Sequence, residues 1–292
     1  MSQFTGSMVA LITPFKDGCI DETALRNLID WQIENGTSVL VPCGTTGESA
    51  TLSHQEHDRV IEITVTQAKG RAKVLAGTGS NSTTEAIRLT EQARKAGADG
   101  ALLICPYYNR PTQEGLYQHF AAIAQAVKIP QILYNVPGRT GVNLLPETVA
   151  KLAKISNIVG IKEASGNLIQ ASEVIAACPK EFALLSGEDA LNWPLYAIGA
   201  QGAISVTANI LPKLCAELWA ENQKGNIKRC QQIHQELLEI NNLLFIETNP
   251  VPVKTALALM GKCSEEIRLP LAALKKENRE KLAQVLKKHQ LI

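Results

Sequence analysis

Short apolar segments alternate along the chain with longer segments whose apolar residues recur every three or four positions. The short segments are typical of buried strands in a parallel sheet, and the longer ones are typical of amphipathic helices. Strands are expected at residues 8–12, 38–41, 74–76, 101–104, 131–134, 158–162, 182–185 and 202–206. Eight strand–helix units in about 220 residues predict an α/β fold, the (β/α)8 TIM barrel.

Helix start signals support this division of the chain. Ser53 and Glu56 form one Ser-x-x-Glu pattern, and Ser82 and Glu85 form another. Each pattern predicts a capping box, in which the two side chains satisfy backbone N–H groups at the helix start. Pro146 suits the first turn of the helix that follows the fifth strand.

The last part of the chain lacks the strand pattern. Helical periodicity continues there at residues 227–244, 253–260 and 271–289. We therefore expect a catalytic barrel over residues 1–224 and a C-terminal helical appendix over residues 225–292. A doubly wound open sheet is the alternative fold, but no Gly-x-Gly-x-x-Gly motif follows an early strand to support it.

Charge and cysteine content narrow the classes of function. Lys and Arg number 29 and Asp and Glu number 28, so the net charge is close to zero. The sequence also has no run of basic residues, and both features argue against nucleic acid or an anionic membrane as a partner. No signal-peptide pattern or apolar run of membrane-spanning length is present. The cysteines form no CxxC pair or zinc-binding spacing, and we expect seven reduced thiols in a cytoplasmic protein, at positions 19, 43, 105, 178, 215, 230 and 263.

Lys162 ends the apolar segment of the sixth predicted strand. A buried ammonium group is costly unless it is paired or its pKa is lowered, and a lysine with a lowered pKa is a nucleophile toward carbonyl carbon. The alternative is a lysine that reaches solvent or pairs with a carboxylate such as Glu163. This segment alone favours a solvated or paired lysine, so the case for a nucleophilic lysine depends on the residues at the other strand ends.

Other strand ends carry side chains that complement such a lysine. The active site of a (β/α)8 barrel forms where the strands end. Thr45 and Thr46 follow the second strand within Gly-Thr-Thr-Gly, Tyr134 ends the fifth strand, and Arg139 comes shortly after it. Tyr107 and Tyr108 follow the fourth strand. Hydroxyls can cradle a small carboxylate, phenols can move protons, and an arginine can hold a second carboxylate. Together they favour imine chemistry with a 2-oxo acid and require no metal or nucleotide.

Three motifs in these segments resemble a known family. They are GTTGE at 44–48, YNVPGRT at 134–140 and GIKE at 160–163. Over essentially the whole chain, the sequence resembles the pyruvate-dependent class I aldolase group, and within it most closely the dihydrodipicolinate synthase family. The resemblance implies condensation of pyruvate with L-aspartate 4-semialdehyde to 4-hydroxy-tetrahydrodipicolinate, the first committed step of diaminopimelate and lysine biosynthesis. It implies no cofactor and no metal.

The resemblance also assigns the catalytic roles. Lys162 corresponds to the lysine that forms the Schiff base, and Tyr134 to the proton donor and acceptor. Thr45 and Tyr108 correspond to the remaining members of a proton relay. In the family the relay tyrosine comes from a neighbouring subunit, and the usual assembly is a homotetramer built as a dimer of dimers.

Substrate contacts follow from the same resemblance. Thr46 corresponds to the residue that holds the pyruvate carboxylate, and Gly187 and Ile204 to residues lining that pocket. Arg139 corresponds to the residue that binds the carboxylate of the semialdehyde. Arg139 also argues against a sugar-acid aldolase such as N-acetylneuraminate lyase, because a polyol substrate needs neutral hydrogen-bonding groups there. A non-catalytic metabolite-sensing barrel is a further alternative, and it predicts a lost lysine or phenol.

A second site is suggested by residues around the second and third helices. His54 and His57 share one helix face, and Glu85 lies in the first turn of the next helix. From spacing alone, capping and solvated histidines explain these residues. In lysine-inhibited members of the family, however, an allosteric lysine site is formed by the positions matching Ser49, Ala50, His54, His57, Gly79, Asn81, Glu85 and Tyr107. The resemblance therefore implies feedback inhibition by L-lysine.

Overall fold

Eight parallel strands close into a barrel, in a computed structural model that describes residues 3–292. Each strand pairs with its neighbour along the chain, and the last closes the ring on the first. The strands are β1 (Gly6–Ala10), β4 (Val39–Val41), β5 (Lys73–Gly77), β6 (Gly100–Ile104), β7 (Gln131–Asn135), β8 (Ile158–Glu163), β9 (Ala183–Ser186) and β10 (Gly202–Ser205). The fold expected from the hydrophobic pattern is confirmed.

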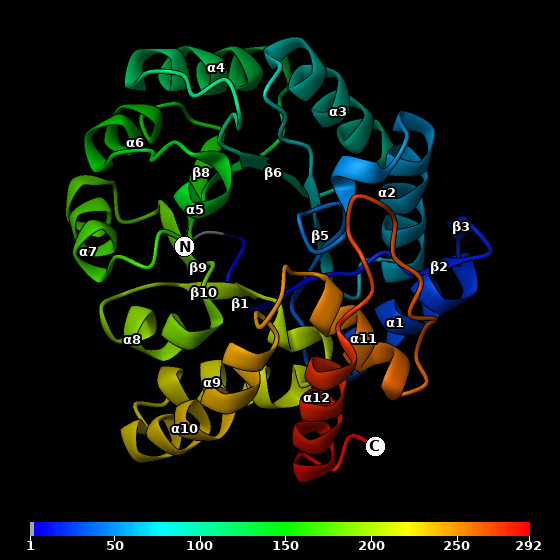
Figure 1. Ribbon diagram of the computed structural model, residues 1–292. Coiled ribbons are helices and arrows are strands. Elements are labelled where there is room, and N and C mark those ends of the chain that lie inside the picture. Colours follow the sequence, from blue (N-terminus) through cyan, green and yellow to red (C-terminus); the bar gives the residue numbers. More distant parts are fainter. Residues whose placement is uncertain (1–2) are drawn as a thin grey trace.

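Helices surround the barrel, as the view along its axis shows (Figure 1). They are α1 (Glu22–Glu34), α2 (His54–Ala68), α3 (Thr83–Ala96), α4 (Gln113–Ala126), α6 (Pro146–Leu152), α7 (Leu168–Ala177), α8 (Asn192–Ala197) and α9 (Pro212–Gln223). Short turns of helix lie at the strand ends: η1 (Ser49–Thr51), α5 (Pro137–Thr140), η2 (Asp189–Leu191) and η3 (Thr207–Asn209). The ring arrangement places the ends of all eight strands around one central space.

The strands are apolar on both faces because each face meets a different core. Val9 of β1 belongs to the large cluster between strands and helices, whereas its neighbours Met8 and Ala10 belong to the cluster inside the barrel. Tyr134 is part of the inner cluster, and Lys162 is its partner residue on the neighbouring strand. Strand alternation therefore directs Tyr134 and Lys162 to the barrel interior.

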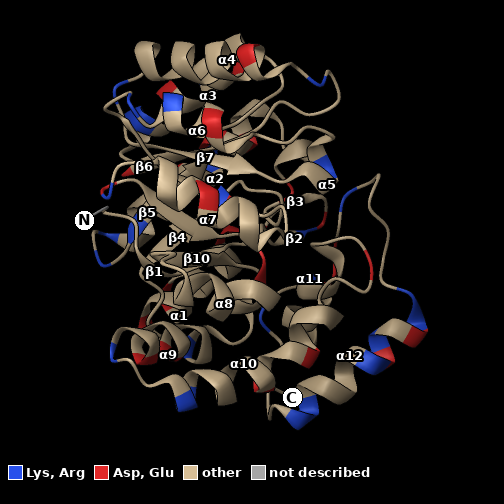
Figure 2. Ribbon diagram, turned by 90° about the vertical axis from the view of Figure 1, so that its left-hand side faces the viewer, with Lys and Arg blue, Asp and Glu red and all other residues tan. Residues whose placement is uncertain are grey.

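The C-terminal region consists of α10 (Ile227–Leu243), α11 (Val251–Leu259) and α12 (Lys276–Lys288). In the side view, α5 and α11 lie at the opposite end of the barrel from the N-terminus, where the strands end (Figure 2). A small hairpin of β2 (Phe15–Lys16) and β3 (Cys19–Ile20) lies at this end too. The division at residue 225 stays a prediction.

Local sequence signals were confirmed in part. The capping box of Ser53 and Glu56 is present, and Pro146 is the first residue of α6. The prediction of the second capping box was half right. Ser82 caps α3, but the Glu85 side chain bonds to Ser80 and His54 and not to the backbone at the helix start. The last helix was expected over 271–289 and begins only at residue 276, because residues 269–271 form a turn around Pro270. The β2–β3 hairpin and α5 were not foreseen.

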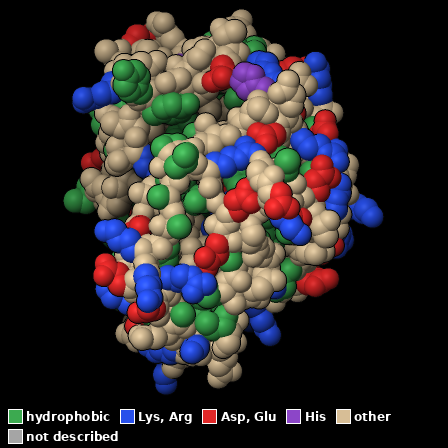
Figure 3. Space-filling model, turned by 45° about the vertical axis from the view of Figure 1, so that its right-hand side comes forward, with side chains coloured by type: hydrophobic (Ala, Val, Ile, Leu, Met, Phe, Trp, Pro, Cys, Tyr) green, Lys and Arg blue, Asp and Glu red, His purple; other side chains and the backbone are tan. Residues whose placement is uncertain are grey.

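Surface and composition features add three findings. Within residues 3–292, no helix has the length and apolar character needed to cross a membrane. In the same range the seven cysteines are free, and no cluster of acidic, histidine and cysteine side chains has a metal-binding arrangement. Basic and acidic side chains are interspersed on the face shown in Figure 3.

Candidate active site

A cavity of about 260 Å³ opens where the barrel strands end. Residues on or directly after β1, β4, β6, β7, β8, β9 and β10 line it, together with residues of α5 and of the segment before α11. Its lining includes most of the catalytic and substrate-binding residues expected from the sequence, namely Thr45, Thr46, Tyr134, Arg139, Lys162 and Gly187. Residues 200 positions apart in the sequence therefore meet at one place.

Lys162 is the central polar group of this cavity. Its side chain is almost fully buried, with 5% of its surface exposed, and its Nζ lies 4.2 Å from the centre of the Tyr134 ring. Among the residues that the structure describes, none forms a hydrogen bond or ion pair with Nζ. An amine that makes no competing bond is available to a ligand in the cavity.

Glu163 does not neutralise Lys162. The Glu163 carboxylate faces the helices outside the barrel and accepts hydrogen bonds from the backbone N–H of Ser165 at 2.7 Å and from the side chains of Asn135 and Gln170. Consecutive residues of a strand point to opposite faces, so the two side chains are separated by the backbone. The alternative in which Lys162 pairs with Glu163 is wrong.

Gly187 keeps the space beside the lysine free. A Cβ atom at this position would lie 2.9 Å from Cε of Lys162 and 2.7 Å from Cβ of Ala164. Gly187 follows β9 directly, and its N–H donates to the carbonyl of Glu163 at 2.8 Å. A larger residue would therefore displace the lysine or the strand end.

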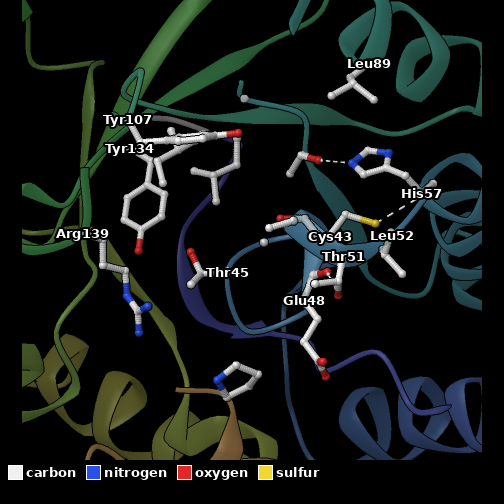
Figure 4. A pocket seen from close by; sticks show the side chains of 18 of the residues that line it. Cys43, Thr45, Glu48, Thr51, Leu52, His57, Leu89, Tyr107, Tyr134 and Arg139 are labelled. Carbon is white, nitrogen blue, oxygen red and sulfur yellow. Dashed lines mark hydrogen bonds between the residues drawn. The ribbon is translucent and has the colours of Figure 1, made fainter. Parts of the chain in front are cut away.

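Tyr134, Arg139 and Thr45 lie on the same side of the adjoining pocket drawn in Figure 4, and all three also line the first cavity. Tyr134 comes from β7, and Arg139 comes from α5, the short helix that begins at Pro137. The guanidinium of Arg139 donates to the backbone carbonyl of Asn249 at 3.3 Å. Arg139 thus brings a positive charge to the outer part of the cavity.

The loop that carries Thr45 and Thr46 is held from several sides. Asn249 donates to the Thr46 hydroxyl at 3.0 Å, and the Thr13 hydroxyl donates to the carbonyl of Gly47 at 2.7 Å. The side-chain oxygen of Asn249 is buried without a hydrogen-bond partner among the described residues. An unsatisfied acceptor in the lining leaves room for a donor from a ligand.

Two residues expected at this site lie outside its lining. Tyr108 has 91% of its surface exposed and a positive φ of 71°, and it is not part of the lining. Ile204 is buried in the core cluster inside the barrel. Neither side chain therefore lines the cavity of its own chain.

A second cavity of about 510 Å³ adjoins the first. Gly44, Thr45, Leu102, Tyr134, Arg139 and Asn249 line both cavities. The second cavity is also lined by seven of the eight residues expected at the second site, namely Ser49, Ala50, His54, His57, Gly79, Glu85 and Tyr107. Asn81 is the exception, and its side chain donates to the carbonyl of Tyr107 at 3.2 Å.

Two titratable side chains of the second cavity, Glu85 and His57, already have hydrogen-bond partners. Glu85 accepts hydrogen bonds from Ser80 and from His54, whose Nε2 lies 3.0 Å away, and these bonds lower the pKa of the Glu85 carboxyl. His57 is buried and bonds through Nε2 to the carbonyl of Gly77 at 2.9 Å. Burial lowers the pKa of His57, which favours its neutral form.

Several residues that line the first cavity were not expected from the sequence, among them Ser165, Glu188, Phe245 and Asn249. Ser165 and Glu188 lie two residues beyond strand ends, so the strand-end rule could have found them. Burial, followed by the nearby Asp189 charge, raises the pKa of Glu188. Phe245 and Asn249 come from the segment between α10 and α11, for which the sequence offered no signal.

A (β/α)8 barrel whose strand ends enclose an unpaired lysine and a ring of polar groups is the architecture of an enzyme. The model of the dihydrodipicolinate synthetase family matches residues 3–289, and the chain belongs to this family. It is a lyase of lysine and diaminopimelate biosynthesis.

Curated relatives carry one name. The 4-hydroxy-tetrahydrodipicolinate synthase of Geotalea uraniireducens is 61% identical over 289 residues, which are 99% of this chain and all of the relative. The enzyme of the same name from Trichlorobacter lovleyi is 60% identical over the same shares of both chains. The match therefore extends over both the barrel and the C-terminal helices.

Solved structures give the same assignment. Dihydrodipicolinate synthase from Aquifex aeolicus is 50% identical and superposes with a TM-score of 0.98 over 99% of both chains. A chloride-inhibited synthase from Acinetobacter baumannii complexed with pyruvate is 49% identical, with a TM-score of 0.97 over 99% of both chains. The synthase from Cyanidioschyzon merolae with lysine bound is 39% identical, with a TM-score of 0.97 over the full length of both.

Proposed function

We propose that this enzyme condenses pyruvate with L-aspartate 4-semialdehyde through a Schiff base on Lys162, giving 4-hydroxy-tetrahydrodipicolinate. The observation that carries the proposal is the position of Lys162, buried at the end of β8 and free of any ion pair with a described residue. The pyruvate complex of the Acinetobacter baumannii relative supports pyruvate as the first substrate. The positive charge of Arg139 supports a second substrate with a carboxylate.

The reaction begins with attack of the Lys162 amine on the keto carbon of pyruvate. Loss of one water gives the imine, and loss of a methyl proton gives the enamine. The enamine carbon then attacks the aldehyde carbon, a carbon–carbon bond forms, and the aldehyde oxygen takes up a proton to become the hydroxyl. Finally, the amino group of the bound product attacks the imine carbon, closes the ring and releases Lys162 as the free amine.

The surrounding residues serve these steps. Tyr134, whose ring lies against Nζ of Lys162, exchanges protons with the imine and the alkoxide, and Thr45 extends the relay. Thr46 and the space beside Gly187 receive the pyruvate carboxylate. Arg139 binds the carboxylate of the semialdehyde.

A coupled assay with both substrates tests the reaction directly. We expect turnover that requires both pyruvate and L-aspartate 4-semialdehyde. Failure of turnover in the presence of a pyruvate adduct on Lys162 would assign the enzyme to another aldehyde, as in the sugar-acid aldolases. Absence of both turnover and adduct would reject the imine mechanism.

We also propose that L-lysine inhibits the enzyme by binding in the second cavity. Seven expected residues line this cavity, and a full-length relative has been solved with lysine bound. Glu85 is suited to the effector's α-ammonium group, and the face of His54 and His57 is suited to its side-chain amine. An assay in which millimolar lysine leaves the rate unchanged would contradict this proposal.

The exposed Tyr108 supports an oligomer in which one copy completes the relay of another. We propose a homotetramer built from tight dimers, with Tyr108 entering the neighbouring active site. Mixing a Lys162→Ala chain with a Tyr108→Phe chain should then restore activity, because one mixed site contains both native residues. If the mixed dimers form but activity is not restored, Tyr108 does not act across subunits.

A further inference from the structure

A fully buried ion pair lies directly beside the loop of Thr45 and Thr46. Nζ of Lys254, in α11, is 2.6 Å from a carboxylate oxygen of Glu48, and the two side chains have 1% and 0% of their surface exposed. Glu48 ends the Gly-Thr-Thr-Gly loop, whereas Lys254 is 206 residues away in the sequence. The pair therefore ties the C-terminal helices to the active-site loop.

Each charged group of the pair has a further favourable contact. Nζ of Lys254 lies 4.0 Å above the Phe15 ring, and the second oxygen of Glu48 accepts the backbone N–H of Arg268 at 3.2 Å. The Arg268 guanidinium is directed away from Glu48 to Glu56, at 2.6 Å, and also covers Phe15. Charges buried in this way are favourable only in a well-defined geometry, because any displacement loses the attraction that offsets their desolvation.

The backbone conformation of Glu48 connects the ion pair to the loop of Thr45 and Thr46. Glu48 has a φ of 54° in the left-handed region, which a side chain rarely adopts without tertiary support. Its N–H donates to the carbonyl of Thr45 at 3.1 Å, and the N–H of Gly47 donates to the carbonyl of Gly44 at 3.0 Å. Fixing Glu48 therefore fixes the turn that orients the hydroxyls of Thr45 and Thr46.

We infer that Glu48 and Lys254 are positioning residues, which hold the Thr45–Thr46 turn in the geometry that accepts pyruvate. This inference rests on the proposed reaction, because it concerns the pyruvate side of that site. Neither residue touches the reacting atoms: Lys254 lines neither cavity, and Glu48 lines only the second one. Their contribution is indirect and is made through the backbone.

The competing explanation is that the pair contributes only to stability. Single substitutions cannot separate the two explanations, because each leaves a buried charge without its partner. The double variant Glu48→Gln/Lys254→Met removes both charges with side chains of similar size. A buried pair replaced in this way often costs little stability, so the double variant should melt closer to the native protein than either single variant.

The test measures melting temperature, steady-state kinetics and the rate at which borohydride traps pyruvate on Lys162. For the folded double variant we expect kcat/KM for pyruvate and the trapping rate to fall about 10- to 100-fold, as small displacements of positioned groups do. The KM for the semialdehyde should stay near its native value, because Arg139 lies on α5 and not on this loop. The native enzyme must form the adduct first, which checks the proposed reaction independently.

The matched control is Glu56→Gln. Glu56 joins the same two segments through Arg268, but this pair is partly exposed, and the Glu56 carboxylate bonds to Ser53 and Arg268 and not to the loop of Thr45 and Thr46. Gln retains the capping pattern with Ser53, so we expect native kinetics. If the double variant folds and traps pyruvate at the native rate, or if Glu56→Gln slows trapping equally, the positioning role is overturned.

Discussion

The two adjoining cavities share a wall but differ in how their polar groups are satisfied. In the first, the Lys162 amine is buried and bonds to none of the described residues. In the second, Glu85 is already bonded to Ser80 and His54, and His57 is bonded to Gly77 through Nε2, while its Nδ1 has no hydrogen-bond partner among the described residues. A ligand of the first cavity meets an amine that is free to react, whereas a ligand that binds Glu85 must replace existing bonds.

This difference supports the proposal that the first cavity carries out the reaction and that the second binds the inhibitor. Unsatisfied buried groups raise the free energy of the empty site and are relieved by a substrate. Exchange of one set of polar bonds for another yields a modest net free energy, which suits an effector whose concentration varies. Thr45, Tyr134 and Arg139 line both cavities, so occupation of one can alter the other.

The largest effect is expected for Lys162→Ala. Without the amine no imine forms, and we expect activity to fall by a factor on the order of 10³ or more, with the circular dichroism spectrum retained. Lys151→Ala, on the outer helix α6, is the control and should keep native activity. Activity above a few per cent in the Lys162→Ala enzyme would contradict the covalent role.

Tyr134→Phe should have the next largest effect. The ring that contacts Lys162 is retained, but the proton donor is lost, so kcat should fall about 100-fold or more while pyruvate binding persists. Tyr117→Phe, on α4, removes a hydroxyl remote from both cavities and should be neutral. Native kcat in the Tyr134→Phe enzyme would move the proton transfer to another group.

Arg139→Ala should act mainly on the second substrate. Loss of charge-assisted bonds to a carboxylate typically corresponds to about a 10- to 100-fold change, here expected in the KM for the semialdehyde. Arg110→Ala is the control, because Arg110 bonds to the carbonyl of Gly141 and lies outside both cavities. If pyruvate trapping alone suffered, the assignment of Arg139 would be wrong.

Glu85→Gln should weaken inhibition by lysine at the second cavity. The shape of the side chain is kept and its charge is lost, so half-maximal inhibition should require about three- to tenfold more lysine. Basal kcat should remain within about twofold, because Glu85 does not line the first cavity. Glu91→Gln on the same helix, where Glu91 pairs with Arg94, is the control. Unchanged inhibition would remove Glu85 from the effector site.

The smallest expected effect is the contribution of His57 to the pH dependence of folding stability. Burial lowers its pKa below the ordinary 6.5, so below that pH the unfolded chain binds a proton that the folded chain does not. Stability is therefore lost as the pH falls through 6.5 toward the lowered pKa of the folded state. Between about pH 7.5 and 5.5, the melting temperature should fall a few degrees more for the native enzyme than for His57→Gln. Parallel curves would show that His57 is not buried as a neutral group.

The fold was predictable because its signals are local. Apolar runs and helix caps repeat along the chain, and the register of a parallel barrel follows from strand alternation. Lys162 and Tyr134 were predictable for the same reason, since the strand-end rule needs only the position of each strand, whereas Gly187 was expected only from the family resemblance. The C-terminal contributions were not, because Asn249 and Lys254 reach the site through tertiary packing, and nothing near them in the sequence shows it.

The choice between a reactive and a paired lysine also required the structure. The sequence placed Glu163 next to Lys162, and only the strand geometry shows that the Glu163 carboxylate is bonded to Asn135, Ser165 and Gln170 on the other face. Glu85 gives a similar lesson, because its expected capping bond is replaced by bonds to Ser80 and His54. Side chains with several possible partners are decided by packing.

Borohydride reduction in the presence of pyruvate, followed by mass spectrometry of the intact chain and its peptides, is the decisive experiment for imine formation on Lys162. We expect one reduced pyruvate adduct per chain, located on Lys162 and absent from the Lys162→Ala enzyme. An unmodified native chain, or an adduct on another lysine, would contradict this expectation.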